Sequence, residues 1–416
     1  MPAIDPTAGQ AVGGTETRAW LLARGLAAGG RDVVFVVRSP GDPFERSVEG
    51  VTVVGVQDRW YQRYLNIGRS IERTSRWPRI VRPSWSLLRD LPLVVAHRTL
   101  TRRRRDDFSP VARLLPIERA AVWVTFGVQT NSADVIRRCQ QDAKPSVLML
   151  GCDADVDPWF ASEPERVTPY GDRGATCALI LRHATRIVAQ TPWQRDRLNE
   201  RYGRGADVLP NPIDLDRWTA RPNRETQTPG EHRSGRHVLW VGRAEPVHKR
   251  PQEAIAIARL CPEIPFRMVM NPADPATGES VRKSQPENVT LVDFVPPDAM
   301  PQEMAAAVLL LNTSATEGFP NTFLQAAAAG RPIVSQTVLA DWLHETGSGL
   351  CGEGDRERTA THVRELWAND GAADAIGRHG REAVAAKHGL TEVADRFAAI
   401  LEEAAAPGGH RRETTH

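Results

Sequence analysis

Short runs of uninterrupted apolar residues recur along the chain, and longer stretches with apolar residues at helical spacing separate them. Many of the short runs are rich in β-branched residues and contain no alternating polar positions. Runs of this kind are typical of strands that are buried on both faces of a parallel sheet. The pattern therefore predicts strands near residues 33–37, 121–124, 147–150, 187–189, 238–241, 266–270, 289–291, 308–311 and 333–334.

Helical spacing is clearest in four stretches between these runs, at residues 17–26, 194–201, 252–260 and 322–329. A chain that alternates strands with helices over its whole length is typical of the α/β class. We therefore predict doubly wound parallel sheets with helices on both faces.

The alternation is interrupted most clearly at residues 203–236, which are rich in Gly, Pro, Asn, Arg and Thr. We predict the domain junction there, near the Leu-Pro-Asn-Pro segment 209–212, with a polar loop at 221–236. The predicted organisation is a first domain at 1–208, a junction at 209–236, a second domain at 237–388, a terminal helix at 389–406 and a disordered tail at 407–416.

The N-terminus fits this organisation less well. A doubly wound sheet usually opens with an apolar strand, and only Pro2-Ala3-Ile4 precedes the first glycine-containing loop. Two readings stay open: either that strand is missing, or the first sheet is built differently.

The composition narrows the class of protein. The chain has 416 residues, 41% apolar and 25% charged, as expected for a globular protein of two or three domains. The 53 basic and 51 acidic residues nearly balance, which argues against a dedicated nucleic-acid binder. Five widely spaced cysteines without a Cys-x-x-Cys pair support neither a zinc ribbon nor a disulfide framework. With no signal-peptide pattern and no membrane-spanning apolar run, we expect a cytoplasmic protein.

The strongest chemical signal lies between the predicted strand 308–311 and the helical stretch 322–329. Pro320 suits the first turn of a helix, and Gly330 suits the position just beyond its end. The free N–H groups at the start of this helix would lie at the carboxyl edge of the sheet, where phosphate groups are commonly bound. Glu317, in the preceding loop, can accept hydrogen bonds from hydroxyl groups. An ordinary βα unit with a polar loop is the alternative.

A second signal follows the predicted strand 238–241. Arg243 offers a planar pair of donors to phosphate oxygens, and Lys249 adds a compact second charge. Two cations near one helix N-terminus would suit a diphosphate, although two solvated surface charges are the simpler alternative. A third, weaker signal is the pair Gly13-Gly14 before the first helical stretch; Thr15 as an N-cap is an equally good explanation.

Together these segments resemble the retaining glycosyltransferases of the GT-B fold, in the large family-four group also called glycosyltransferase group 1. The resemblance covers most of the chain, and the order and spacing of the segments make it specific. The matching segments are 13–16 (GGTE), 188–192 (VAQTP), 208–214 (VLPNPID), 241–243 (VGR) with Lys249, 288–291 (NVTL) and 317–321 (EGFPN).

The resemblance implies two Rossmann-like domains facing a cleft, with an acceptor-side first domain and a second domain that binds the nucleotide sugar. It implies transfer of a sugar from a nucleoside diphosphate sugar to a glycan or lipid-linked acceptor, with retention of the anomeric configuration. Arg243 and Lys249 would stabilise charge on the leaving diphosphate, and Glu317 would bind sugar hydroxyls. The donor would also contact Gly13, Gly14, Gly318, Phe319, Pro320, Asn321 and Gln325, the last of these at the ribose. No metal and no cofactor beyond the donor are expected.

Two departures from the family pattern bear on activity. The family has Glu where this chain has Gln325, which can still bond a ribose but carries no charge. The first domain usually has a His near the sugar in the segment that matches 124–130, and none occurs there; Asp153 or Asp155 could supply polar contacts instead. A non-catalytic nucleotide-sugar-binding relative of the same fold therefore stays as the alternative. An epimerase would need acid and base side chains flanking the sugar, which the sequence does not offer.

One stretch of the first domain is strongly basic. Residues 59–105 hold thirteen arginines and two acidic residues, Glu72 and Asp90, with tryptophans and tyrosines interleaved. This composition suits peripheral contact with an anionic membrane at its inner face, or a lipid-phosphate acceptor. A solvated insertion is the equally weighted alternative, and nucleic acid is disfavoured.

Overall fold

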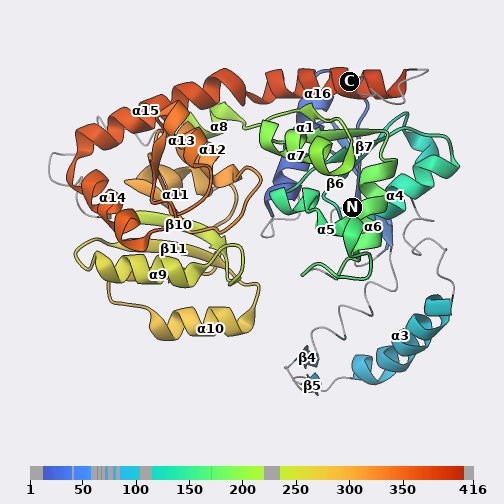
Figure 1. Cartoon of the computed structure of the whole chain (residues 1–416), viewed down its shortest axis with the longest axis horizontal. Helices are drawn as coiled ribbons and strands as arrows, with labels where there is room; N and C mark the ends of the chain where they lie inside the picture. Colours follow the sequence, from blue (N-terminus) through green and yellow to red (C-terminus); the bar gives the residue numbers. More distant parts are fainter. Residues whose placement is uncertain are drawn as a thin grey trace.

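The structure is a computed structural model that describes residues 13–39, 42–57, 63, 67, 71–73, 78–80, 85–103, 115–169, 171–219 and 235–406. These residues form two α/β lobes that lie side by side, with a small arm below the first lobe in Figure 1. The predicted α/β class is confirmed. The residues 2–4, most of the polar loop 221–236 and the tail 407–416 lie outside the described residues.

The second lobe is built on one six-stranded sheet in the order β12-β11-β10-β13-β14-β15, and every neighbouring pair is parallel. Alternate residues of its strands pack into two different hydrophobic clusters. Trp240 and Met268 face a cluster that includes helices α9 and α14, whereas Leu239 and Val269 face a cluster that includes α12 and α13. Both faces are therefore covered, as the uninterrupted apolar runs predict. The elements are β10 (Val238–Arg243), α9 (Pro251–Leu260), β11 (Phe266–Asn271), α10 (Pro275–Ser284), β12 (Val289–Val292), α11 (Met300–Ala306), β13 (Leu309–Asn312), α12 (Asn321–Ala328), β14 (Ile333–Ser335), α13 (Ala340–Thr346), β15 (Gly349–Cys351), α14 (Arg356–Ala368) and α15 (Asp370–Lys387).

The first lobe contains two sheets in its described residues. Four parallel strands run in the order β6-β7-β8-β9, and a second sheet has the order β1-β3-β2 with β2 antiparallel to β3. The expectation of a single doubly wound sheet in each half is therefore met in the second lobe, whereas the described part of the first lobe holds two. The elements are α1 (Gly14–Ala28), β1 (Val34–Ser39), β2 (Phe44–Val48), β3 (Val51–Gln57), β6 (Trp123–Phe126), α4 (Thr130–Gln141), β7 (Ser146–Met149), α5 (Trp159–Ser162), α6 (Gly174–His183), β8 (Arg186–Ala189), α7 (Pro192–Tyr202), β9 (Asp207–Val208) and α8 (Leu215–Thr219).

The last helix, α16 (Leu390–Ala405), returns to the first lobe. Figure 1 shows it along the top of the molecule, beside α1. Val393 and Phe397 of α16 are buried in one cluster with Leu22 and Leu26 of α1 and Met149 of β7. The position of this helix was predicted correctly, but its return across the junction was not.

The chain crosses between the lobes twice, and the two crossings lie together. The backbone N–H of Ile213 donates to the carbonyl of His388 at 2.8 Å, and Ile213 forms a parallel bridge with Gly389. The imidazole Nδ1 of His388 lies 2.7 Å from the carbonyl of Asn211. The junction predicted at 209–236 is therefore tied to the start of the terminal helix.

The arm consists of the two-stranded ribbon β4 (Ile71–Arg73) and β5 (Pro78–Ile80) and the helix α3 (Trp85–Arg103). It accounts for part of the basic stretch; Arg59, Trp60, Tyr61, Tyr64 and Trp77 lie outside the described residues. No helix in the described part of the chain is long and apolar enough to cross a membrane.

Candidate functional site

A cavity of about 1730 Å³ is lined by residues of both lobes. Gly13, Gly14 and Asp153 reach it from the first lobe, and Arg243 and Glu317 reach it from the second. Three of the predicted signals, which are far apart in the sequence, therefore meet at one place.

The loop after β10 presents two cations to this cavity. Arg243 is the last residue of β10, its side chain is exposed, and its guanidinium forms no hydrogen bond or ion pair with any described residue. Glu245 then accepts the backbone N–H groups of Val247 (2.8 Å), His248 (2.8 Å) and Lys249 (3.2 Å). Burial alone would raise the pKa of Glu245, but these three amides outweigh it and lower the pKa below its usual range. A fixed carboxylate thus holds the loop that carries Lys249.

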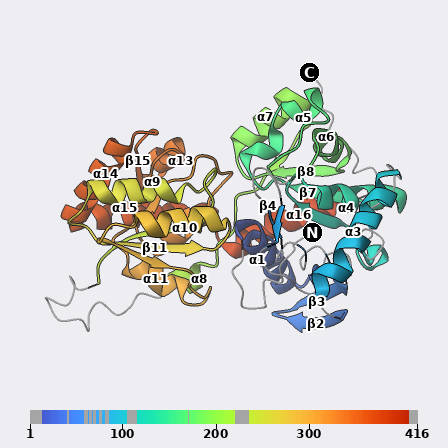
Figure 2. The ribbon, with the colours of Figure 1, turned by 90° about the horizontal axis from the view of Figure 1, so that it is seen from below.

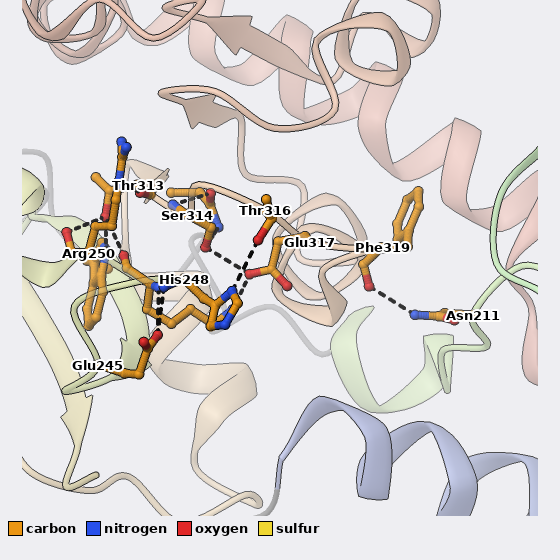
Figure 3. A network of polar contacts seen from close by, with 12 residues as sticks. Asn211, Glu245, His248, Arg250, Thr313, Ser314, Thr316, Glu317 and Phe319 are labelled. Atoms are coloured by element: carbon orange, nitrogen blue, oxygen red, sulfur yellow. Dashed lines mark hydrogen bonds and ion pairs between the residues drawn. The ribbon is translucent and has the colours of Figure 1, made fainter. Parts of the chain in front are cut away.

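The loop after β13 meets the loop after β10, because the two strands are neighbours in the sheet. The Lys249 ammonium donates to Oε1 of Glu317, and the hydroxyl of Ser314 donates to the same oxygen at 2.8 Å. His248 adds a contact between its Nδ1 and the hydroxyl of Thr316 at 3.1 Å, as Figure 3 shows. Oε2 of Glu317 accepts no hydrogen bond from the described residues, so it is available to a ligand hydroxyl.

Helix α12 begins at the same edge of the sheet. Pro320 is its N-cap and Asn321 its first residue, and no side chain caps its free N–H groups. The helix ends at Ala328, and Gly330 follows with a φ of 68°, a left-handed conformation that favours glycine. The positions predicted for the proline and for the terminal glycine are confirmed to within one residue.

The N-terminus of α12 is hydrogen-bonded to the first lobe and to the junction. The amide of Asn321 donates to the carbonyl of Gly14 at 2.8 Å, and its Oδ1 accepts from Asn211 at 2.9 Å. The same Asn211 amide donates to the carbonyl of Phe319 at 3.0 Å. The Gly13-Gly14 loop and the segment 317–321 are therefore joined by hydrogen bonds.

Gly318 lies directly against the first lobe. A Cβ atom at this position would lie 1.9 Å from Oε1 of Gln190, 2.8 Å from Nε2 of Gln194 and 3.1 Å from Cα of Cys152. All three residues belong to the first lobe. A larger residue here would displace the buried, hydrogen-bonded amide groups of Gln190 and Gln194 and would press against the backbone of Cys152.

The structure places most of the predicted donor residues along the cavity. Phe319 is in its wall, but its ring is buried and packs edge-on against Trp342 at 5.2 Å, so the side chain belongs to the core. Gln325 is half-buried in the second turn of α12, and neither it nor Gly318 is among the lining residues. Thr15 is not the N-cap of α1, because the helix begins at Gly14 and Gly13 is its N-cap. The predicted residues that line the cavity are Gly13, Gly14, Arg243, Lys249, Glu317, Phe319, Pro320 and Asn321.

A chain of amide side chains that sequence reasoning did not assign continues the network into the first lobe. Asn211 accepts from Gln190 at 3.2 Å, and the backbone of Gln190 donates to the side chain of Gln194 at 2.8 Å. Gln194 in turn donates to Asp153 at 3.0 Å. Gln190 and Asn211 lie within two of the segments that match the family, 188–192 and 208–214. The resemblance therefore included these positions, but it did not show that their side chains are hydrogen-bonded to each other.

Asp153 and Asp155 have different surroundings. Asp155 is buried and accepts three backbone N–H groups, from Gly151 (2.6 Å), Cys152 (3.3 Å) and Val128 (3.2 Å), so its carboxylate holds the loop together. Asp153 lines the cavity and accepts one hydrogen bond. Burial, together with the negative charges of Asp155 and Glu317, raises the pKa of Asp153 to about 6. Both residues line the cavity, and Asp153 is the less buried of the two.

We expect Asp153→Asn to stabilise the protein at neutral pH. Folding raises the pKa of this group from 3.8 to about 6, so the folded state binds the proton more tightly and stability falls as the pH rises between those values. Asparagine keeps an oxygen for Gln194 and carries no charge. The free energy of unfolding should therefore rise by about 1–2 kcal/mol at pH 7, less than the full pKa shift implies because the carboxylate is partly solvated.

Denaturant titrations of both proteins across this pH range measure the effect. The difference in unfolding free energy should shrink toward zero below about pH 4. A difference that is independent of pH would show that the charge of Asp153 is not the cause.

Comparisons with known proteins agree with this architecture. The family described as Glycosyl transferases group 1 matches residues 235–369, which lie in the second lobe. A D-inositol 3-phosphate glycosyltransferase of Nocardia farcinica (strain IFM 10152) is 28% identical over 235 residues, 51% of each chain. A second protein of that name, from Paenarthrobacter aurescens (strain TC1), is 26% identical over 54% of this chain and 58% of its own. The chain thus spans about half the length of the curated relatives it matches.

Solved structures match over nearly the whole chain. Sucrose-phosphate synthase from Thermosynechococcus elongatus superimposes with a TM-score of 0.67 at 18% identity and covers 96% of both chains. The Anabaena protein HepE, solved with UDP and glucose, gives a TM-score of 0.63 at 15% identity and covers 95% of this chain and 97% of its own. At these identities the likeness establishes the fold, and the predicted GT-B arrangement of two Rossmann-like lobes is confirmed. The assignment to family four specifically stays a prediction.

Proposed function

We propose that the protein is a retaining glycosyltransferase that moves a sugar from a nucleoside diphosphate sugar to a glycan or lipid-linked acceptor. One observation carries the proposal: Arg243, the Lys249–Glu317 pair and the start of α12 line one cavity between the lobes. A ligand with a diphosphate and a polyhydroxylated ring matches this set of groups.

The proposed chemistry follows from where charge develops. When the bond between the anomeric carbon and the phosphate oxygen breaks, negative charge accumulates on the departing diphosphate. Arg243, Lys249 and the N–H groups of α12 are positive groups already in place, so they lower the barrier without having to reorganise. Glu317, held by Lys249 and Ser314, would orient a sugar hydroxyl through its available oxygen. We propose no resident metal or cofactor beyond the donor.

We further propose that Asp153 takes the place of the histidine that the family resemblance leads one to expect in the first lobe. Asp153 lines the cavity, is less buried than Asp155, and accepts a hydrogen bond from Gln194. A carboxylate that lies at a cavity wall, and whose charged form is disfavoured by burial, is typical of functional sites. It would accept a hydrogen bond from a sugar or acceptor hydroxyl.

The alternative is a non-catalytic nucleotide-sugar binder of the same fold. Gln325 and the absence of a histidine from 124–130 favour it, whereas the Arg243, Lys249 and Glu317 set favours transfer. We also propose a cytoplasmic location with peripheral contact to an anionic membrane.

Nucleotide binding is the first test. We expect UDP, GDP or ADP at about 100 times its dissociation constant to stabilise the fold by about 2.7 kcal/mol, because a ligand that binds only the folded state shifts the unfolding equilibrium. The measurement is the melting temperature with each nucleotide. HepE was solved with UDP, so UDP is the nucleotide expected to act.

Donor-hydrolysis profiling across nucleotide sugars then separates the two candidates. Stabilisation by a nucleotide together with release of that nucleotide from its sugar supports transfer. Stabilisation without turnover, with acceptors present, supports the binder. No stabilisation by any of the three would refute both.

A further inference from the structure

Helix α3 exposes an apolar face on the arm of the first lobe. Trp85 is 88% exposed, Leu88 67% and Leu91 38%, and Val95 is 54% exposed one turn further on. These positions are three or four residues apart, so they lie along one side of the helix. Leu87, Asp90 and Val94 are buried, and they share the opposite side. The helix is thus apolar on the side that faces solvent.

The surrounding sequence is basic. Of the two acidic residues among 59–105, Asp90 is fully buried and accepts from Arg89 at 2.9 Å, with Arg63 at 3.9 Å. Its charge is therefore compensated inside the arm. The thirteen arginines of this stretch include Arg89, whose side chain is 68% exposed next to the apolar face.

We propose that the exposed face of α3 docks on an anionic phospholipid bilayer. Trp85, Leu88 and Leu91 would enter the boundary between headgroups and acyl chains, Arg89 would lie at the phosphates, and the net positive charge of the sequence 59–105 would attract anionic lipids. A second copy of this chain is a poorer partner, because two arms with this excess of arginine repel each other. Tryptophan beside basic residues is also typical of segments at the bilayer surface.

The position of the arm suits such a contact. In Figure 1 the arm lies below the first lobe, on the side opposite α16, and Figure 2 shows from below that α3 lies in front of that lobe. A bilayer could therefore meet α3 without displacing α16 from α1. The docking rests on the peripheral membrane contact proposed above and needs no transferase activity, so its failure would remove that contact and leave the proposed sugar transfer untouched.

Vesicle sedimentation with the full chain tests the proposal. The protein is mixed with vesicles of phosphatidylglycerol and phosphatidylcholine, or of phosphatidylcholine alone. We expect binding to the anionic vesicles only, weakened by added salt because screening reduces attraction to the headgroups. The double variant Trp85→Ser/Leu88→Ser should bind at least about tenfold less, since it removes most of the apolar area.

Phe294→Ser is the matched control, because Phe294 is an apolar residue 38% exposed on the second lobe. It should bind like the wild type, and circular dichroism shows whether each variant is folded. Three results would overturn the proposal: no binding to anionic vesicles, equal binding to both vesicle types, or undiminished binding by a folded double variant. A dimer in light scattering that the double variant dissociates would instead identify the face as a contact between copies.

Discussion

Arg243→Ala is expected to lower kcat/KM for sugar transfer by about 100- to 1000-fold, the usual effect of removing one fixed donor to a developing negative charge. The same loss is expected for Lys249→Ala. The guanidinium of Arg243 forms no hydrogen bond or ion pair with a described residue and the side chain is exposed on the cavity, so its loss should change the free energy of unfolding by less than about 0.5 kcal/mol. Initial rates of nucleotide release, measured beside denaturant titrations, give both quantities.

Arg282→Ala is the control for charge alone. Arg282 is an exposed cation of the same lobe, paired with Asp293 and absent from the cavity wall. It should leave the rate within about twofold, because screened surface charges contribute little. If both cavity variants kept full activity, the proposed donor site would be wrong.

Gly318→Ala is expected to lower activity by about 100-fold, because the added methyl group forces the facing groups of the first lobe out of position. The added methyl group would lie 1.9 Å from Gln190 and 3.1 Å from the backbone of Cys152. Separation of the lobes by even about 1 Å misaligns groups that must act on the same ligand. The hydrogen bonds of Asn211 to Phe319 and Asn321 would be strained at the same time.

Gly278→Ala is the matched control in the second lobe. A Cβ atom there would meet only the methyl group of Ala244, at 3.8 Å, and the site lies within α10, where alanine is the better helix former. Activity should be unchanged and stability equal or slightly higher. Small-angle scattering of Gly318→Ala should show a larger radius of gyration than the wild type. A variant as compact and as active as the wild type would show that this contact does not limit closure.

The sequence predicted best those strands and helix ends that depend on residues close together in the chain. Five of the six strands of the second lobe were anticipated, all except β15, because each of their apolar runs is buried in the sheet and ends where a polar loop begins. Parallel strands share a carboxyl edge, so Arg243 and Glu317 could be expected at one site before the structure was known. Pro320 and Gly330 marked the ends of α12 through backbone preferences that act within a few residues.

The features that the sequence did not show depend on how segments far apart in the chain are placed in space. The hydrogen bonds of Asn211 join the junction to α12 across more than one hundred residues, and no periodicity encodes such a contact. The β2–β3 hairpin of the first lobe also went unpredicted, because β2 is short and mostly polar at its exposed positions. The different surroundings of Asp153 and Asp155 depend on which backbone amides surround each carboxylate.

The return of α16 determines how this protein could be recombined with others of its architecture. The first lobe is not a continuous stretch, since residues 390–405 complete it after the second lobe has been passed. A hybrid made by one exchange near residue 209 would set Phe397 of one parent against Leu22 of the other. An exchange at two points, in which residues 390–405 and the N-terminal part come from the same parent, leaves that interface unchanged. Grafting the second lobe alone is therefore best done as an insertion between the two crossings at Ile213 and Gly389.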